Sequence, residues 1–265
     1  MTDLTVWLTD GTDSCTTGGM PPLHLVDTPG RSRRVVFSLA SLGWRRALHE
    51  VATRRRPYDP ETDHSFDVRH RTDTAGTVQP DDLGIEDGER RSQAIRYLPS
   101  PPRVTNWLLD RVDVDPASHA FVDLGCGKGR VVLIAAQRPF RQVVGVEVSA
   151  RLAETARRNV VTYRPPPVRR STIEIVEADA AAFDMPTSDL LIHLYHPFEP
   201  EVTAAVLRRL QGSLAASPRK VTIAYLTYTA AVAQIATMFG EFGWLHCRRY
   251  EQSIRGHYNW LIYSN

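Results

Sequence analysis

The chain has 265 residues, of which 42% are hydrophobic and 23% are charged, and its formal net charge is +2 at pH 7. These values are ordinary for a soluble globular protein, and so small a net charge indicates no particular class of partner. No apolar stretch approaches the roughly 18 residues of a membrane helix, and the three widely spaced cysteines indicate neither a disulfide framework nor a metal site. We therefore expect one large domain, or one domain with an extension, in a reducing cytoplasmic compartment.

The first 56 residues form two stretches of different composition. Residues 1–30 are rich in Thr, Asp, Gly and Pro and show no sustained periodicity, so we expect a mostly disordered leader, and their acids without Lys or Arg do not fit a signal peptide. Residues 31–56 hold eight arginines and one acid, Glu50, and their apolar residues recur at helical spacing. This predicts a basic amphipathic helix, either with its arginine face in solvent or presented to RNA, an acidic protein or a membrane.

Residues 57–95 are polar and acid-rich, with several Pro and Gly turn signals. Together with the basic helix they would form an N-terminal extension over residues 31–95. The main domain would then occupy residues 96–265. A helix is predicted at Asn106–Val112, just before the first strand of that domain.

Residues 121–130, Phe-Val-Asp-Leu-Gly-Cys-Gly-Lys-Gly-Arg, predict a strand, a tight turn and the start of a helix. Gly125, Gly127 and Gly129 stand where the backbone needs positive φ or must approach a ligand closely. The dinucleotide fingerprint is G-x-G-x-x-G, so the third glycine comes one residue too early for a nicotinamide cofactor. Asp123 stands two residues before the first glycine, where an acid would oppose a pyrophosphate and suit a cationic ligand.

Two further strands are predicted to end in acids. Val143–Glu147 closes on a carboxylate 22 residues after Gly125, near the ~20 expected for an acid that binds ribose hydroxyls. Ile173–Asp179 is the third strand, and its last residue is again an acid. Ligands bind at the carboxyl ends of parallel strands, so the three acids should lie together there. Glu147 or Asp179 alone could be a helix cap, but the ordered series indicates a binding site.

Strands and helices continue to alternate after this third strand. Further strands are predicted at residues 189–195 and 220–228, and helices at residues 152–160, at 202–214 and up to 240. Residues 245–254 and 258–263 are rich in aromatic and β-branched residues and flank Arg255-Gly256-His257, which is a hairpin signal. The predicted fold class is α/β: a seven-stranded, mostly parallel sheet with helices on both faces, a C-terminal antiparallel hairpin and an N-terminal helical extension.

The glycine loop and the acids that follow it resemble those of class I S-adenosylmethionine (SAM)-dependent methyltransferases, which have a Rossmann-like seven-stranded fold. Asp73–Gly76 and the loop are also similar to segments of bacterial methyltransferase-like proteins, so the resemblance runs from about residue 65 to the end. It implies SAM as the cofactor. It also implies that Glu147 binds the ribose hydroxyls and that Asp179 accepts a hydrogen bond from the adenine amino group. It does not specify the methyl acceptor.

The resemblance implies a set of cofactor-binding residues. Tyr97–Ser100 is similar to the Tyr-x-Pro-Ser/Thr element that lines the SAM pocket of some protein-lysine methyltransferases, although a plain proline-rich turn is the alternative. Cys126 is interpreted as a small filler between glycines and not as a nucleophile. The full expected set is Tyr97, Ser100, Asp123, Gly125, Cys126, Gly127, Gly129, Glu147, Val148, Asp179, Ala180 and Tyr195.

The acceptor side is expected where the fourth strand ends, at Tyr195-His196-Pro197-Phe198. Many enzymes that methylate planar nitrogens carry Asn or Asp there, followed by Pro-Pro-Tyr or Pro-Pro-Phe. The histidine and the single proline depart from that pattern, but they place a titratable imidazole near the acceptor. We take His196 and Tyr195 as catalytic candidates, with a pocket-shaping role as the alternative for His196. His193, further back in the strand, is expected to be buried core.

The expected function is methyl transfer from SAM to a nitrogen or oxygen of a small-molecule or peptide acceptor. Protein lysine is one alternative, because of Tyr97–Ser100, and RNA is another, because of the basic helix. A non-catalytic SAM-binding module is the alternative of another class, supported only by the missing Asn at position 196. The sequence leaves the oligomeric state open.

Overall fold

The computed structural model describes residues 59–164, 171–252 and 258–265. The chain divides into two compact units, Met1–Tyr58 and Asp59–Asn265. The disordered leader and the basic helix that we expected before residue 57 lie outside the described residues. The domain boundary expected at residue 96 falls inside the second unit, to which residues 59–95 also belong.

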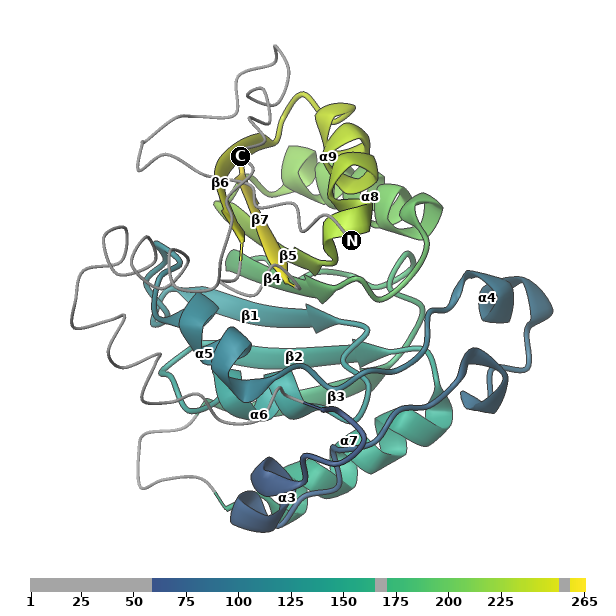
Figure 1. Cartoon of the computed structure of the whole chain (residues 1–265). Coiled ribbons are helices and arrows are strands. Elements are labelled where there is room, and N and C mark those ends of the chain that lie inside the picture. The colour runs from purple at the N-terminus through teal and green to yellow at the C-terminus, as the bar shows by residue number, and fades with distance from the viewer. Residues whose placement is uncertain (1–58, 165–170, 253–257) are drawn as a thin grey trace, which may run out of the picture. The chain divides into compact units, whose positions relative to one another are not determined.

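A seven-stranded sheet forms the centre of the second unit, with the strand order β3-β2-β1-β4-β5-β7-β6 (Figure 1). The strands are β1 (His119–Leu124), β2 (Gln142–Glu147), β3 (Ile173–Glu177), β4 (Asp189–Tyr195), β5 (Val221–Thr227), β6 (His246–Gln252) and β7 (Asn259–Ser264). Strands β1 to β5 pair in parallel, and β7 lies antiparallel between β5 and β6. The predicted mostly parallel sheet with an antiparallel C-terminal pair is confirmed.

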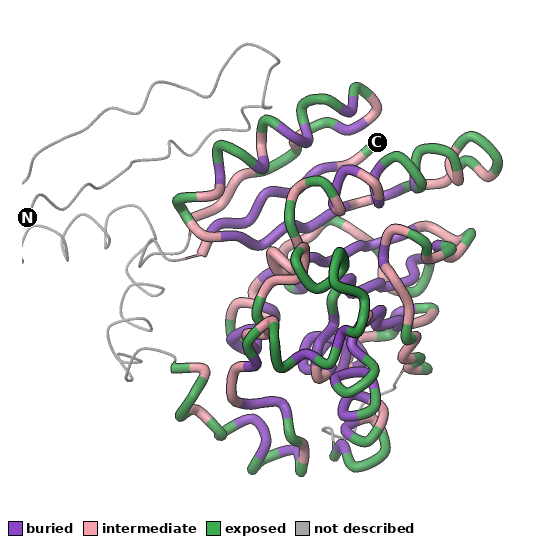
Figure 2. The backbone as a smooth tube through the Cα atoms, turned by 90° about the vertical axis from the view of Figure 1, so that its right-hand side faces the viewer, coloured by how far each residue is buried: buried purple, intermediate pink, exposed green. Residues whose placement is uncertain are grey.

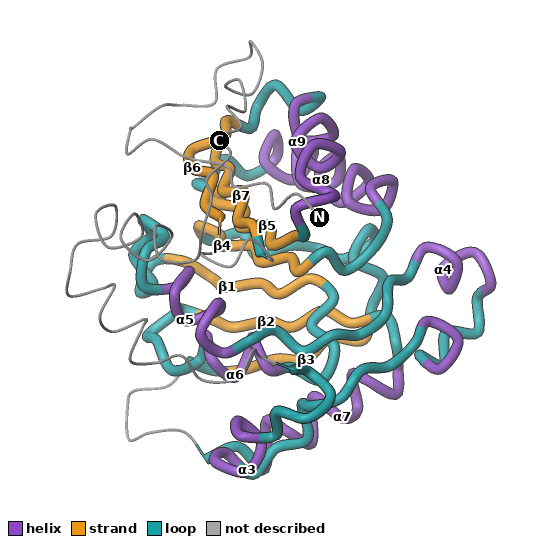
Figure 3. The backbone as a smooth tube through the Cα atoms, viewed as in Figure 1, coloured by secondary structure: helices purple, strands orange, loops and turns teal. Residues whose placement is uncertain are grey.

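The helices of the second unit flank this sheet (Figure 3). They are α3 (Ser65–His70), α4 (Gly88–Gln93), α5 (Pro102–Leu109), α6 (Arg130–Ala135), α7 (Ala150–Thr162), α8 (Pro200–Ala216) and α9 (Val232–Gly240), with short 3₁₀ turns at Pro80–Asp82 and Thr229–Ala231. Helix α5 begins four residues before the predicted start at Asn106, because the fixed φ and missing N–H of proline suit the first turn. Ser149 caps α7, since its Oγ accepts a hydrogen bond from the Leu152 N–H.

The sheet separates two hydrophobic cores, because alternate side chains of a strand point to opposite faces. On one face Val122 and Leu124 of β1 join apolar residues of α8 and α9. On the other face Phe121 joins apolar residues of α5 and α6. All six residues of β1 are buried, and Figure 2 shows the long buried stretches of the backbone in the interior. The central strand β1 therefore packs against hydrophobic side chains on both faces of the sheet.

The strand order reverses between β1 and β4. From β1 the chain builds outward through β2 to β3, and from β4 it builds in the opposite direction to β5. In open α/β sheets, ligands bind at such a switch point, outside the carboxyl ends of the strands. The sheet therefore places the glycine loop after β1 and the turn after β4 side by side.

Candidate active site

A cavity of about 270 Å³ lies at the carboxyl ends of β1, β2, β3 and β4. Its walls come from the glycine loop, from the residues that close the strands, and from residues 93–100. Every residue that we expected to contact the cofactor lines this cavity except Gly129, and His196 lines it too. The lining residues from the expected set are Tyr97, Ser100, Asp123, Gly125, Cys126, Gly127, Glu147, Val148, Asp179, Ala180 and Tyr195.

The glycine loop has the left-handed backbone that its sequence predicts. The φ angles of Gly125, Gly127 and Gly129 are +74°, +54° and +85°. A Cβ at Gly127 would lie 2.2 Å from a ring carbon of Tyr97, and one at Gly125 would lie 2.4 Å from Pro197 Cβ. Gly129 instead precedes α6 and its missing Cβ faces α7. Without side chains, Gly125 and Gly127 let Pro197 and Tyr97 pack directly against the loop, and all three glycines permit its left-handed backbone.

Replacing Gly127 by alanine should weaken both the fold and the cofactor site. The left-handed backbone alone costs a non-glycine residue about 1–2 kcal/mol, and the ring of Tyr97 must also move. We expect urea denaturation to show a lower free energy of unfolding, and calorimetry to show weaker SAM binding. Gly243→Ala is the control, because nothing lies within 4 Å of a Cβ at that position. Equal stability of the two variants would contradict this account of the loop.

Glu147 is a buried carboxylate at the end of β2. Its Oε2 accepts a hydrogen bond from the Gly127 N–H at 2.8 Å, and its Oε1 accepts one from the Ser149 N–H at 2.9 Å. Burial raises the pKa of Glu147, and the nearby Asp123 adds to this, while the two backbone donors oppose it. Each carboxylate oxygen has a second lone pair, so this side chain has the acceptor capacity to receive ligand hydroxyls.

Asp123 pairs with a histidine of the neighbouring strand. The parallel register places His193 beside it, and the His193 Nδ1 lies 2.6 Å from the Asp123 Oδ1. Both side chains are almost fully buried, and the His193 ring packs against Phe121 and Trp260. His193 is buried, as we expected, but it also lines the cavity. The sequence analysis did not anticipate this pair, although the register of two predicted strands would have indicated it.

Asp179 lies at the β3 end of the cavity. Its Oδ1 accepts a hydrogen bond from the Ala181 N–H at 2.8 Å, and its Oδ2 lies 3.5 Å from Arg90 Nε of α4. The arginine side chain is half exposed, so this ion pair contributes little to stability. The arrangement leaves the Asp179 carboxylate at the edge of the cavity.

The acids suit the cofactor that the sequence implies. Asp123 lies near the end of β1, Glu147 closes β2 and Asp179 follows β3, and all three line one cavity. SAM carries a sulfonium cation, an ammonium group, ribose hydroxyls and an adenine amino group, all of which carboxylates attract or accept hydrogen bonds from. Burial and the neighbouring Glu147 raise the pKa of the Cys126 thiol, so this cysteine stays a neutral filler between the glycines.

His196 follows β4 in a backbone conformation that non-glycine residues seldom adopt. Its φ is +39°, and such outliers concentrate at functional sites. Its Nδ1 lies 3.2 Å from the Tyr225 hydroxyl and 3.2 Å from the Thr227 hydroxyl. Burial lowers the pKa of His196 below its usual 6.5, and Glu199 partly opposes this. The imidazole is therefore mainly neutral at neutral pH.

Tyr195 stands beside His196 in a cluster of aromatic rings. Its ring centroid lies 6.2 Å from that of Tyr228 and 6.2 Å from that of Tyr258. Burial raises the pKa of the Tyr195 hydroxyl, and the two neighbouring tyrosines raise it further. Tyr195 is thus a neutral phenol at neutral pH.

Residues outside the expected set also line the cavity. Arg130, at the start of α6, is almost fully buried and lies on the wall. Residues 93–96 also line the cavity, and the backbone of Ala94 forms an isolated bridge with that of Phe198. Neither feature has a sequence signal, because Arg130 follows the last glycine as an ordinary polar residue and residues 93–96 show no periodicity.

Comparison with known proteins gives a family match and a set of distant structural neighbours. Residues 121–217 match the family model described as a methyltransferase domain. No curated protein matches the sequence. Among the described residues, no helix is long and apolar enough to cross a membrane.

Three solved structures illustrate the neighbours. The ribosomal protein L11 methylase of Lactobacillus delbrueckii subsp. bulgaricus is 13% identical, with a TM-score of 0.46 over 62% of this chain and 77% of that one. An RNA methyltransferase of Salinibacter ruber in complex with S-adenosyl-L-homocysteine is 19% identical, with a TM-score of 0.42 over 63% and 93%. The magnesium protoporphyrin IX methyltransferase of Synechocystis PCC 6803 with bound SAM is 17% identical, with a TM-score of 0.42 over 61% and 76%.

The matched region begins in β1 and ends after α8, so it contains the glycine loop, the strand-end acids and the turn after β4. These parts line the cavity together with residues 93–100, which precede the matched region. Residues 121–217 are therefore similar to a methyltransferase domain, and the residues that line the cavity suit S-adenosylmethionine as a methyl donor.

Proposed function

We propose that this enzyme methylates a nitrogen or oxygen of a small-molecule or peptide acceptor, and that His196 takes up the proton that the acceptor loses. The observation that carries the proposal is a neutral imidazole on the cavity wall. It lies directly after β4, on the other side of β1 from the strands that carry Glu147 and Asp179.

The order of the strands supports an acceptor site at this end of the cavity. Along the edge of the sheet, Asp179 follows β3, Glu147 closes β2, Asp123 lies in β1 and His196 follows β4. The family resemblance assigns adenine to the first of these and ribose to the second. The rest of the cofactor then extends toward β1 and β4, so the acceptor approaches past Tyr195 and His196.

Methyl transfer from a sulfonium needs no covalent intermediate with the protein. When bound, SAM would supply a sulfonium methyl group: a lone pair on the acceptor would form the new bond to the methyl carbon, while the carbon–sulfur bond breaks and its electron pair leaves with S-adenosylhomocysteine. The cavity walls hold the reacting groups in line, an effect that can reach about 7–11 kcal/mol. When the His196 Nδ1–H donates to the hydroxyl oxygen of Tyr225 or Thr227, Nε2 keeps its lone pair. That nitrogen takes the proton from the acceptor N–H or O–H, and Tyr195 stays a neutral hydrogen-bonding group.

Protein lysine and RNA stay as alternative acceptors. Tyr97, which prompted the first, donates its hydroxyl to the Thr74 carbonyl oxygen and packs its ring on Gly127. These contacts serve the glycine loop whatever the acceptor is. The basic helix that prompted the second lies outside the described residues. A neutral base suits any acceptor that carries a proton to be removed, these two included, so the product search below decides between the acceptor classes.

The test is a search for the methylated product by mass spectrometry. The enzyme is incubated with isotope-labelled SAM and separate pools of metabolites, peptides, proteins and RNA. Label in metabolites or peptides supports the proposal. Label only in proteins or only in RNA would overturn it in favour of the corresponding alternative. Tight SAM binding with no label in any pool would indicate a non-catalytic SAM-binding module.

A further inference from the structure

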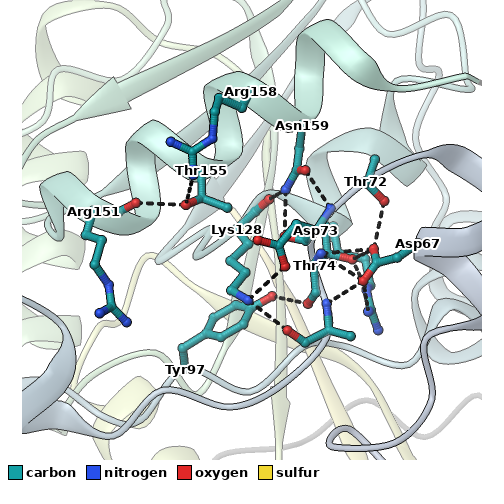
Figure 4. Close-up of polar contacts among 12 residues, drawn as sticks. Asp67, Thr72, Asp73, Thr74, Tyr97, Lys128, Arg151, Thr155, Arg158 and Asn159 are labelled. Carbon is teal, nitrogen blue, oxygen red and sulfur yellow. Dashed lines mark hydrogen bonds and ion pairs between the residues drawn. The ribbon is translucent and has the colours of Figure 1, made fainter.

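A short turn upstream of the matched domain contacts the glycine loop directly (Figure 4). The turn is Asp73–Ala75, between α3 and the first 3₁₀ turn. From the loop side, the Lys128 Nζ donates to the Ala75 carbonyl oxygen at 2.8 Å and lies 3.3 Å from the Asp73 carboxylate. The Arg130 Nε donates to the Thr74 Oγ1 at 2.7 Å. Side chains of Lys128 and Arg130 therefore contact all three residues of the turn.

Two further side chains tie the same turn to the site. The Tyr97 hydroxyl donates to the Thr74 carbonyl oxygen at 2.7 Å, while its ring covers Gly127. The Asn159 amide of α7 accepts from the Asp73 N–H at 2.7 Å and donates to the Asp73 and Lys128 carbonyl oxygens, each at 2.9 Å. One asparagine thus joins the turn, the glycine loop and α7 (Figure 4).

The turn is itself held in shape by a buried carboxylate. Asp67 of α3 accepts hydrogen bonds from the hydroxyls of Thr72 and Thr74 and from the N–H groups of Thr74 and Ala75. Burial opposes its ionisation, but these donors outweigh burial and lower the pKa of Asp67. The Asp67 carboxylate is therefore ionised at neutral pH and holds the turn through these hydrogen bonds.

We propose that the turn Asp73–Ala75 is a part of the cofactor site, which holds the glycine loop in its binding conformation. Thr74 and Asn159 are positioning residues in this view, because neither lines the cavity. They act through Arg130, Lys128 and Gly127. A loop already fixed in its bound shape loses less conformational freedom on binding, so affinity rises with this preorganisation.

This inference rests on SAM as the cofactor and extends the site beyond the matched residues. The functional unit then begins before Asp67, and not at residue 96 or 121. It also gives a reason for the buried position of Arg130, which donates to Thr74 from the cavity wall and whose guanidinium carbon lies 5.3 Å from the Phe66 ring centroid.

The main test compares three threonine variants in the full chain. Thr74→Val keeps the shape but removes the hydroxyl that receives the Arg130 N–H, whereas Thr74→Ser keeps that hydroxyl. Thr155→Val is the matched control, because the Thr155 hydroxyl on α7 donates to the Arg151 carbonyl oxygen and accepts from Arg158, both of its own helix. Calorimetry gives the dissociation constants of SAM and S-adenosylhomocysteine, and thermal unfolding gives the stability of each variant.

We expect Thr74→Val to weaken binding of both ligands about tenfold, which corresponds to ~1.4 kcal/mol, while the other two variants bind like the parent protein. The KM for SAM should rise with kcat at saturating SAM nearly unchanged, and the loop amides of the ligand-free protein should exchange hydrogen faster. Unchanged binding in Thr74→Val would overturn the proposal, and so would an equal loss in Thr155→Val. If the parent protein bound no SAM, the cofactor assignment itself would be at fault.

Lys128→Met provides an independent test should Thr74→Val not fold. The Lys128 Nζ contacts the turn and the side chain does not line the cavity. Removing this positive charge should by itself favour a cationic ligand. The substitution also removes the hydrogen bond from Lys128 to the turn, which should leave the glycine loop less ordered and weaken SAM binding. If the proposal holds, we expect this second effect to be the larger and SAM binding to be weaker. Tighter or equal binding would show that the turn does not position the loop.

Discussion

Replacing His196 by asparagine should lower turnover by roughly 10²–10⁴-fold while the affinity for SAM stays near that of the parent protein. The substitution keeps a hydrogen-bonding group beside Tyr225 and Thr227 but removes the nitrogen that takes the proton. It also restores the residue found at this position in the enzymes that the sequence resembles. Initial rates measured with the acceptor that mass spectrometry identifies give kcat, and calorimetry gives the SAM affinity.

The pH dependence separates a base from a pocket-shaping residue. Burial lowers the pKa of His196, and only the neutral imidazole accepts a proton. The activity of the parent protein should therefore rise with pH through a midpoint below the usual histidine pKa of ~6.5 and then level off. In His196→Asn this limb should disappear. Full activity of the variant at all pH values would leave His196 with a pocket-shaping role only.

Replacing Glu147 by alanine should weaken SAM binding at least about tenfold. Hydrogen bonds to charged groups contribute roughly 1.5–3 kcal/mol each, and the ribose hydroxyls would lose this acceptor. The variant also leaves the Gly127 and Ser149 N–H groups without the carboxylate that now receives them. Calorimetry with SAM measures the loss, and thermal unfolding shows how much of it reflects a disturbed loop.

Glu147→Gln serves as the conservative comparison for this prediction. It keeps one carbonyl oxygen and the volume of the side chain but removes the charge. We expect binding between that of the parent protein and that of Glu147→Ala. If all three proteins bound SAM equally well, Glu147 would be a structural partner of the loop and of the start of α7, and not a ribose ligand.

The sheet was predictable from the sequence because most of its strands are buried and apolar and because strands and helices alternate along the chain. The loop from Asp123 to Gly129 was predictable for a different reason, since only glycine suits its backbone. The grouping of the acids at the ends of β2 and β3 was predictable because parallel strands place their carboxyl ends at the same edge of a sheet. Each of these features depends on local sequence or on a simple rule of parallel sheets.

The contacts of the upstream turn were not predictable in this way. Lys128, Arg130 and Asn159 lie far from the turn in sequence and bond to it only after the chain has folded. The pair of Asp123 and His193 likewise depends on which strands are neighbours. The partners of polar side chains follow from long-range packing, whereas glycine patterns and strand ends follow from local rules.

The position of β7 has a consequence for how the chain assembles during synthesis. Strand β6 precedes β7 in the chain but joins the sheet only through it, since β7 lies between β5 and β6. The edge of β5 therefore stays open while β6 leaves the ribosome, and an open edge is a site of wrong pairing. Strands β1 to β4, with the loop and the acids, are complete well before this point. The strands that line the cofactor cavity therefore precede the late insertion of β7, which is the step that covers the edge of β5.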